Sequence, residues 1–131
     1  MIEYKKELTK IDSDQLSGFF VGWKQPLSKE KHYQILKNSE YIFLAFDTRE
    51  EKVVGFVNAL SDGVSFAFIP MLEVLPEYQN RGIGTKLMEM LLSDLEEISN
   101  IDLTCDPELQ NFYERFGMLK SRGMVIRKYL E

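Results

Sequence analysis

The segment 66–75, FAFIPMLEVL, restricts the fold more than any other part of the chain, because its ten residues include a single charged side chain, Glu73. A strand that is apolar at almost every position, rather than at alternate ones, is covered on both of its faces. The segment therefore predicts the central strand of a sheet that lies between two layers. Pro70 cannot donate to a neighbouring strand, so we also expect a bulge or a splay of the sheet beside it. The alternative is that Pro70 marks a sheet edge or the start of a strand.

Shorter patterns on both sides of this segment alternate between strands and helices. Three- and four-residue apolar spacing after Gly82 predicts a long helix that ends near Ser99. Asp12 or Ser13 is a possible cap for a short first helix, and Ser28 opens a second one. The other elements that we expect are strands at 2–8, 41–47, 52–60, 101–105 and 124–130, and a helix at 107–116 closed by Gly117. This order predicts one α/β or α+β domain over residues 1–131.

Composition excludes several classes of partner. The formal net charge of -5 and the pI near 5.0 disfavour nucleic acid as a general partner. No apolar run approaches the ~18 residues of a membrane span, and the opening lacks the apolar core of a secretory signal. Cys105 is the only cysteine, which rules out an internal disulfide and suits a reducing compartment. We therefore expect a cytoplasmic protein that binds no membrane.

The turn at 76–86, which joins the central strand to the long helix, carries the clearest ligand signal. The first amides of a helix lack internal partners and lie at the positive end of the helix dipole, so they bind phosphates readily. Gly82 and Gly84 would let the backbone approach such a ligand. Arg81 and Lys86 each cost about 0.3 to 1 kcal/mol against the dipole. A bound polyanion would neutralise that cost.

Two familiar phosphate-binding patterns do not fit this turn. A Walker loop needs G-x-x-x-x-G-K-[ST], whereas here Thr85 precedes Lys86 and the glycines are too close together. A Rossmann fingerprint needs a third glycine where Leu87 stands. The run 79–84, QNRGIG, instead resembles the Q/R-x-x-G-x-G/A pyrophosphate motif of the GNAT superfamily of N-acetyltransferases.

A second segment resembles the same family. Residues 112–118, FYERFGM, are similar to its F-Y-x-x-x-G-F signature, with Met118 in place of the last aromatic residue. Asp106 stands where the family often has asparagine, seven residues before Tyr113, and we interpret it as a helix cap. The matching stretches cover roughly residues 69–118.

The resemblance implies a GNAT-like fold, with a mixed, mostly antiparallel central sheet that is splayed in the middle and has helices on both faces. It also implies acetyl-coenzyme A as cosubstrate and no metal. Loop amides would hold the pyrophosphate, and strand backbone would pair with the pantetheine arm. The residues assigned to the coenzyme in this way are Leu72, Val74, Gln79, Asn80, Arg81, Gly82, Ile83, Gly84, Thr85 and Phe112.

The implied reaction is acetyl transfer to a primary amine by direct attack within a ternary complex. Tyr113 corresponds to the family's tyrosine that protonates the departing sulfur, and the alternative is a core aromatic beside Phe112 and Phe116. The amide of Leu72 or a near neighbour would stabilise the oxyanion. The alternative is a module that senses coenzyme A or an acyl derivative without turnover.

Glu73 is a candidate general base, since burial would raise the pKa of its carboxyl group. Simple alternation puts Glu73 on the face opposite Phe66 and Phe68, away from the acceptor side that the resemblance implies. A bulge at Pro70 could reverse this parity. The alternative role for Glu73 is a structural ion pair or hydrogen bond.

An aromatic-rich segment near the N-terminus corresponds by order to the wall of the family's acceptor pocket. Plain core packing is an equal interpretation of the same residues. They are Phe19, Trp23, His32 and Tyr33. The acceptor could be a small molecule or a peptide, and a homodimer is possible. His32 and Cys105 do not make a metal site, and we expect Cys105 to be a reduced, half-buried thiol.

Overall fold

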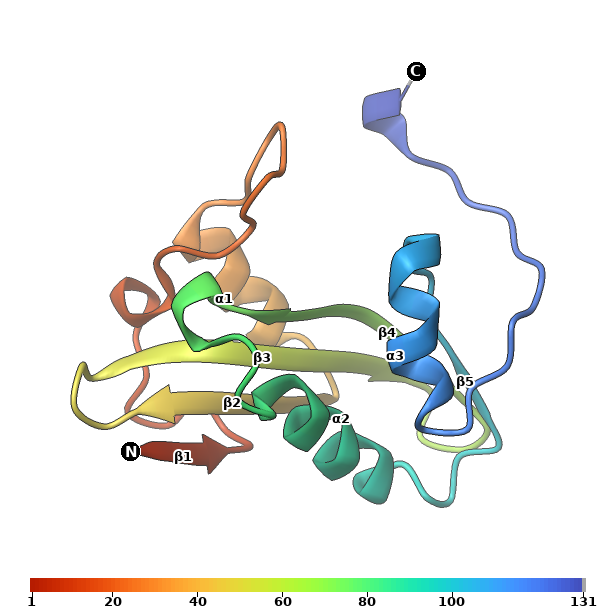
Figure 1. Cartoon of the computed structure of the whole chain (residues 1–131), viewed down its shortest axis with the longest axis horizontal. Helices are drawn as coiled ribbons and strands as arrows, with labels where there is room; N and C mark the ends of the chain where they lie inside the picture. The colour runs from red at the N-terminus through yellow and green to blue at the C-terminus, as the bar shows by residue number, and fades with distance from the viewer. Residues whose placement is uncertain (131) are drawn as a thin grey trace.

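Residues 1–130 are described by the structure, a computed structural model, and they contain a five-stranded sheet (Figure 1). Spatial order follows chain order from β1 to β5. The first four strands are antiparallel, and β5 runs parallel to β4. The strands are β1 Ile2–Lys5, β2 Tyr41–Asp47, β3 Lys52–Ser61, β4 Phe66–Val74 and β5 Asn100–Asp102. This confirms the mixed, mostly antiparallel sheet.

Helices cover both faces of the sheet, as predicted. The long helix α2 (Ile83–Asp94) packs against β2, β3 and β4. On the other face lie α1 (Lys29–Lys37) and the 3-10 turn η1 (Ser13–Leu16). The Ser28 hydroxyl accepts a hydrogen bond from the amide of Lys31 at 3.1 Å and so caps α1 as expected. The remaining helical elements of the described chain are η2 Pro76–Tyr78, η3 Pro107–Leu109, α3 Gln110–Glu114 and η4 Lys128–Leu130.

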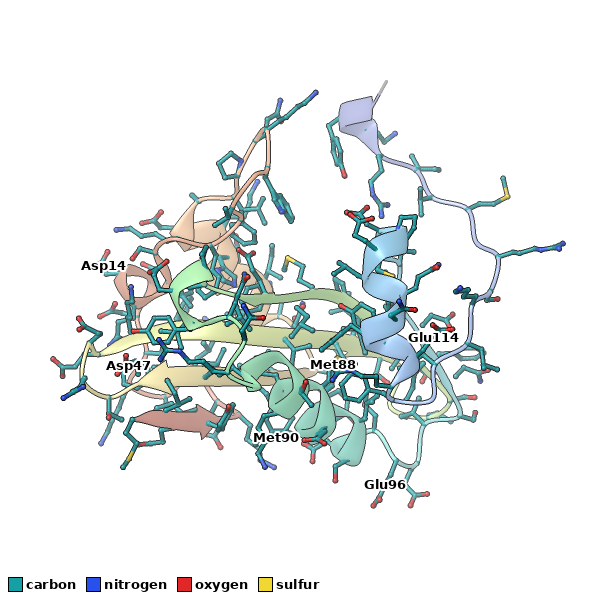
Figure 2. The ribbon with its side chains drawn as sticks, viewed as in Figure 1. Asp14, Asp47, Met88, Met90, Glu96 and Glu114 are labelled. Atoms are coloured by element: carbon teal, nitrogen blue, oxygen red, sulfur yellow. The ribbon has the colours of Figure 1, made fainter. Side chains whose placement is uncertain are left out.

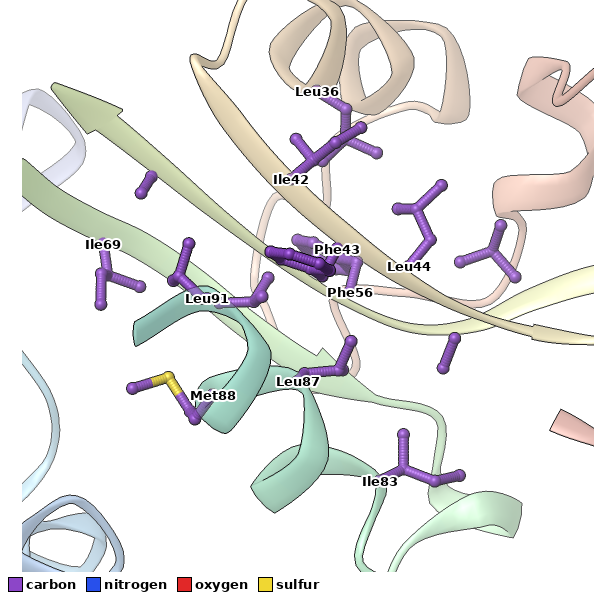
Figure 3. Close-up of a cluster of buried hydrophobic side chains, with 14 of the residues drawn as sticks. Leu36, Ile42, Phe43, Leu44, Phe56, Ile69, Ile83, Leu87, Met88 and Leu91 are labelled. Atoms are coloured by element: carbon purple, nitrogen blue, oxygen red, sulfur yellow. The ribbon is translucent and has the colours of Figure 1, made fainter. Parts of the chain in front are cut away.

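The hydrophobic core lies on both sides of the central strands (Figure 3). Leu36 of α1 packs above the sheet with Ile42, while Leu87, Met88 and Leu91 of α2 pack below it. Gly55 in β3 lets α2 approach closely: a Cβ atom there would lie 3.2 Å from Ile83 and 3.3 Å from Leu87. The depth at which α2 sits, and with it the position of the turn before α2, depends on this glycine.

Strand β4 has a bulge and also a splay, the two alternatives that Pro70 predicted. Asn58 of β3 pairs with Met71, but Leu60 pairs with Phe68, so β4 holds one residue more than β3 over this interval. This bulge lies at residues 69–70. Pairing with β5 covers only Phe66–Phe68, and past that point no strand in the described part of the chain pairs with this edge of β4. The sheet is therefore splayed beside the second half of β4.

Several predicted elements are shorter than expected, and one is wrong. The first strand ends at Lys5, β5 ends at Asp102, the first helix is only a 3-10 turn, and α2 ends at Asp94. The strand predicted at 124–130 does not form: the chain there is extended and ends in η4, because no neighbouring strand of residues 1–130 lies alongside it. No helix of the described residues is long and apolar enough to cross a bilayer.

Candidate functional site

The turn before α2 presents unpaired backbone donors. Gly82 is the N-cap residue with φ +80, a left-handed conformation that favours glycine. No side chain caps the helix, and Lys86 is the first residue whose amide bonds within it, to the Gly82 carbonyl at 3.0 Å. The amides of residues 83–85 have no acceptor within residues 1–130. Unpaired amides at the positive end of a helix are the kind of donors that bind anions.

The open edge of β4 presents further backbone groups. The Leu75 amide donates to the Val54 carbonyl of β3 at 2.8 Å. Because strand backbone alternates in direction, the main-chain groups of Leu72 and Val74 point the other way, into the splay. The Val74 carbonyl accepts from Nε2 of Gln79 at 2.9 Å. The Leu72 amide and carbonyl therefore lie free on the edge that leads to the α2 turn.

Arg81 is held beside this turn by its own neighbours. Its Nη2 donates to the Glu77 carbonyl at 3.0 Å, and its guanidinium lies over the Tyr78 ring, 5.1 Å from the centroid. Tyr78 donates to the Asp47 carboxylate, and this bond raises the pKa of Tyr78 to about 12. The chain of contacts fixes a cation at the start of α2.

Arg115 brings a second cation to the turn, and the sequence analysis missed it. Its Nη2 donates to Oγ1 of Thr85 at 3.1 Å, and its guanidinium lies 4.8 Å from the centroid of Phe112. A Cβ atom on Gly84 would lie 3.8 Å from the same Phe112 ring. The three-residue step from Phe112 to Arg115 on a helix was the available signal.

Tyr113 lies partly buried near Cys105. Burial raises the pKa of Tyr113 to about 12, and Cys105 adds a smaller effect in the same direction. Burial and the carboxylates of Asp106 and Glu108 raise the pKa of Cys105. Both groups are therefore protonated at neutral pH. Cys105 is a poor nucleophile, since the thiolate is the reactive form.

Asp106 occupies the N-cap position that the sequence predicted, but only its backbone acts there. Its carbonyl accepts from the Leu109 amide at 2.9 Å, whereas its carboxylate makes no capping bond.

Because of the bulge in β4, Glu73 lies on the same face of the sheet as Phe66 and Phe68. Simple alternation predicted the opposite face. Glu73 pairs across the sheet with Phe56, whose ring contacts the aromatic segment on the α1 side. Both carboxylate oxygens accept from the Phe20 amide at 3.0 and 2.9 Å, and Oε2 also lies 3.4 Å from the Val21 amide. Burial raises the pKa of Glu73, and the two amides oppose that rise.

The aromatic segment divides between core and surface. Phe19 and His32 are buried, and the His32 ring lies 5.3 Å from Phe19, 4.9 Å from Phe20 and 4.3 Å from Phe56, centroid to centroid. Their burial is consistent with the core packing that was the equal alternative. Trp23 is 48% exposed and lies 4.9 Å from the Phe20 ring, and Tyr33 is partly exposed. Of the four predicted pocket residues, these two have side chains exposed to solvent.

The amino-acid sequence of the chain matches a known protein family. The family model of the acetyltransferase (GNAT) family matches residues 8–118. The chain belongs to the GNAT acetyltransferase family. The matched range includes both the turn before α2 and the splayed edge of β4.

Two relatives and one solved structure show how near the chain lies to other GNAT proteins. An uncharacterized N-acetyltransferase of Pyropia yezoensis is 36% identical over 88% of the chain and 67% of its own length. Serotonin N-acetyltransferase 2, chloroplastic, of Oryza sativa is 30% identical over 92% and 65%. A crystal structure of an acetyltransferase from Deinococcus radiodurans R1 overlays with a TM-score of 0.94 at 38% identity, over 98% of the chain and 89% of that one. The chain spans about two thirds of the length of these curated relatives.

No group of three or more His, Cys, Asp or Glu side chains in residues 1–130 is placed to hold a metal ion.

Proposed function

We propose that this chain is an N-acetyltransferase that uses acetyl-coenzyme A to acetylate a primary amine. The observation that carries the proposal is that unpaired backbone groups occur at two neighbouring places, at Leu72 on the open edge of β4 and at the amides of residues 83–85. Arg81 and Arg115 flank the second of these places. A diphosphate joined to a thioester arm by an amide-bearing linker matches this order of groups.

In this proposal the coenzyme supplies the activated acetyl group, and the protein supplies hydrogen-bond donors. The amides of residues 82–85 bind the pyrophosphate, together with Gln79, Asn80 and Arg81. The Leu72 amide stabilises the oxyanion, because an unpaired donor fixed in a strand needs no reorganisation during the reaction. Phe112 borders the coenzyme beside Gly84.

Tyr113 is the proposed proton donor to the departing sulfur. A thiol has an ordinary pKa of about 8.5, well below the value of about 12 for Tyr113. The phenol therefore stabilises the thiolate by a hydrogen bond, and it transfers its proton to the sulfur only when it receives a second proton. The acceptor amine releases that second proton when the amide forms. With Cys105 protonated, direct attack within a ternary complex is favoured over a covalent enzyme intermediate.

Glu73 is proposed to hold the aromatic segment in place, because its carboxylate accepts hydrogen bonds from the Phe20 amide. The raised pKa of Glu73 also suits a general base. The variant Glu73→Gln distinguishes the positioning role from the role of a base. Trp23 and Tyr33 are proposed walls for the acceptor amine. The rice relative is named for serotonin and a Glycine max relative, TAP1, is named a histone acetyltransferase, so the acceptor panel must hold both small amines and peptides.

The cytoplasm is the proposed compartment, because an unpaired cysteine suits a reducing environment. We propose that residues 1–131 act as one catalytic domain.

Calorimetric titration with acetyl-coenzyme A, followed by a thiol-release assay over arylalkylamines, polyamines and lysine peptides, tests the proposal. We expect micromolar binding and thiol release with at least one amine. Binding without thiol release from any amine would favour the sensor module instead. No binding would overturn both.

A further inference from the structure

His32 of α1 is a buried polar side chain to which the fold gives no partner. It is fully buried, and within residues 1–130 neither ring nitrogen has a hydrogen-bond partner. Burial lowers the pKa of His32 to about 4, so the ring is neutral at pH 7 and carries one donor and one acceptor. Most buried polar side chains are paired, and a leucine at this position would pack without leaving two hydrogen bonds unmade. The histidine therefore needs a reason beyond packing.

The rings around His32 lead from the core to the surface. The Phe56 ring on β3 lies 4.3 Å from the His32 ring, centroid to centroid, and the Phe20 ring lies 4.9 Å from it. The ring of Trp23, which is 48% exposed, lies 4.9 Å from that of Phe20. Phe20 is therefore the ring that joins His32 to a surface side chain.

The backbone around Phe20 is strained and is flanked by two glycines. Gly18, Phe20 and Gly22 are all left-handed, with φ of +94, +68 and +84. Glycine adopts this conformation freely, whereas in phenylalanine it persists only where other contacts hold it. Residues 18–22 are here named the gate. They belong to the loop between η1 and α1, which projects beyond the sheet and whose side chains extend outward from its tip (Figures 1 and 2).

Glu73 of β4 holds the gate in this conformation. Its two carboxylate oxygens accept from the Phe20 amide at 3.0 and 2.9 Å, and Oε2 lies 3.4 Å from the Val21 amide. The outer half of the gate has few other contacts: Val21 is 60% exposed, and a Cβ atom on Gly22 would meet nothing within 4 Å. Release of the Glu73 bonds would let the Phe20 backbone relax and move its ring away from His32.

We propose that the gate opens over a binding site whose polar anchor is His32, and that the ligand is a primary amine with an apolar body and a hydroxyl group at its far end. When Phe20 moves aside, the rings of Phe19 and Phe56 line the site around His32. A hydroxyl both donates and accepts, so it pairs with either nitrogen of the neutral ring. A carboxylate would instead bring a charge into an apolar site.

The site lies beside the place proposed for acetyl transfer. Glu73 pairs across the sheet with Phe56, which contacts His32. Leu72, whose amide is the proposed oxyanion donor, is the preceding residue of β4. An amine that reacts there reaches His32 with its far end through an apolar body between the two groups. The inference rests on the proposed acetyl transfer, because it specifies the class of acceptor.

Matched pairs of amines test the anchor. Tyramine with phenethylamine, and 5-aminopentanol with pentylamine, differ by one hydroxyl group. In at least one pair, we expect kcat/KM for the hydroxylated amine to be higher by about tenfold or more. His32→Leu should bring that ratio to about one, and His32→Gln should restore part of it, because an amide also donates and accepts. No preference in either pair, or an unchanged ratio in His32→Leu, would overturn the anchor.

Leu36→Met is the matched control for the His32 variants. Leu36 is buried one turn further along α1, and the change conserves volume, so the ratio should stay as in the unaltered chain. A ratio lost equally in Leu36→Met would assign the effect to packing and overturn the anchor.

Binding without turnover separates this inference from the proposed function. With coenzyme A in place of the acetyl donor, the hydroxylated amines should shift the NMR signals of the single histidine ring more than their partners do. If no amine is acetylated, the proposed transfer fails, whereas a hydroxyl-dependent shift still supports the site. Signals that do not respond, or that respond equally within each pair, overturn the site even when acetylation proceeds.

Thiol labelling tests the gate. In a Cys105→Ser background, His32→Cys places a thiol behind Phe20, where the closed gate excludes a labelling reagent. Glu73→Ala removes the carboxylate that holds the gate, so it should raise the labelling rate by about tenfold or more. Glu96→Ala, which removes an exposed carboxylate beyond α2, is the control and should leave the rate unchanged. Equal rates with and without Glu73→Ala would overturn the gate.

Discussion

Two regions of this molecule hold polar groups without protein partners, and they differ in access to water. Both ring nitrogens of His32 lie unpaired in the core, between Phe19, Phe20 and Phe56. The amides at the start of α2 are also unpaired, but they lie at a turn on the surface. An unpaired donor that a ligand can reach points to binding. An unpaired polar group that is sealed in the core lowers the free energy of unfolding.

The largest expected effect is the loss of coenzyme binding in Gly82→Asp. A carboxylate at the helix start would face the pyrophosphate, and opposed like charges cost several kcal/mol. We expect affinity for acetyl-coenzyme A to fall about a thousand-fold by calorimetry. Gly63→Asp is the matched control, since Gly63 has φ +76 and, like Gly82, open space around it. Equal losses in both variants would remove the α2 turn as the binding site.

Tyr113→Phe should reduce kcat about a hundredfold while coenzyme affinity stays within about twofold, because the lost hydrogen bond acts on the departing thiolate. Steady-state thiol release and calorimetry together measure the two quantities. Phe116→Leu, on the same helix, serves as a packing control. A parallel fall in kcat and affinity would place Tyr113 in the core rather than in the reaction.

His32 should make folding sensitive to acid. Burial lowers the pKa of His32 to about 4 from an ordinary 6.5. The folded state favours the neutral ring, so this contribution to stability is fully present above pH 6.5 and is lost as pH falls toward 4. We expect about 2 kcal/mol of that loss between pH 7 and pH 5.

Urea unfolding at both pH values, with His32→Leu as the comparison, isolates this contribution from that of the carboxylates. The single histidine also gives one assignable NMR titration. If the ring titrates near 6.5, the aromatic cluster is open to water, and the contrast between the two regions disappears.

Glu73→Gln has the smallest expected effect. The amide oxygen of Gln keeps one acceptor for the Phe20 amide, so a positioning role predicts a rise of about tenfold in the acceptor KM and a nearly constant kcat. A base would behave differently: kcat/KM would fall about a hundredfold and lose its rising limb with pH. The pH profile of both enzymes decides which role Glu73 has.

Local patterns predicted the fold well where they were strong. Pro70 within an apolar strand predicted a bulge or a splay, and both are present. The helical spacing after Gly82 located α2, although the last turn came out shorter because Leu95 already ends it. The family motifs located the turn, and the geometry adds that its amides are unpaired.

Contacts between residues that are far apart in the chain could not be predicted from the sequence. The Arg115 bond to Thr85 joins residues thirty positions apart, and the Glu73 bond to Phe20 joins residues fifty-three apart. Period-two alternation assigned Glu73 to the wrong face, since the parity change depends on the register with β3. Residues 124–130 have a strand composition, but composition alone does not supply a neighbouring strand.

The extra residue in β4 places Glu73 on the α1 side of the sheet and Val74 on the α2 side. A regular strand with the same first half would place them on the opposite sides. Deleting Pro70 would remove the extra residue and exchange the two faces of the second half of the strand. Glu73 would then face α2, and Val74 would face the aromatic segment. Insertions and deletions at this point would thus be far more damaging than substitutions. Changes of amine preference in such a chain are best sought by substitution on the α1 side, with the length of β4 kept constant.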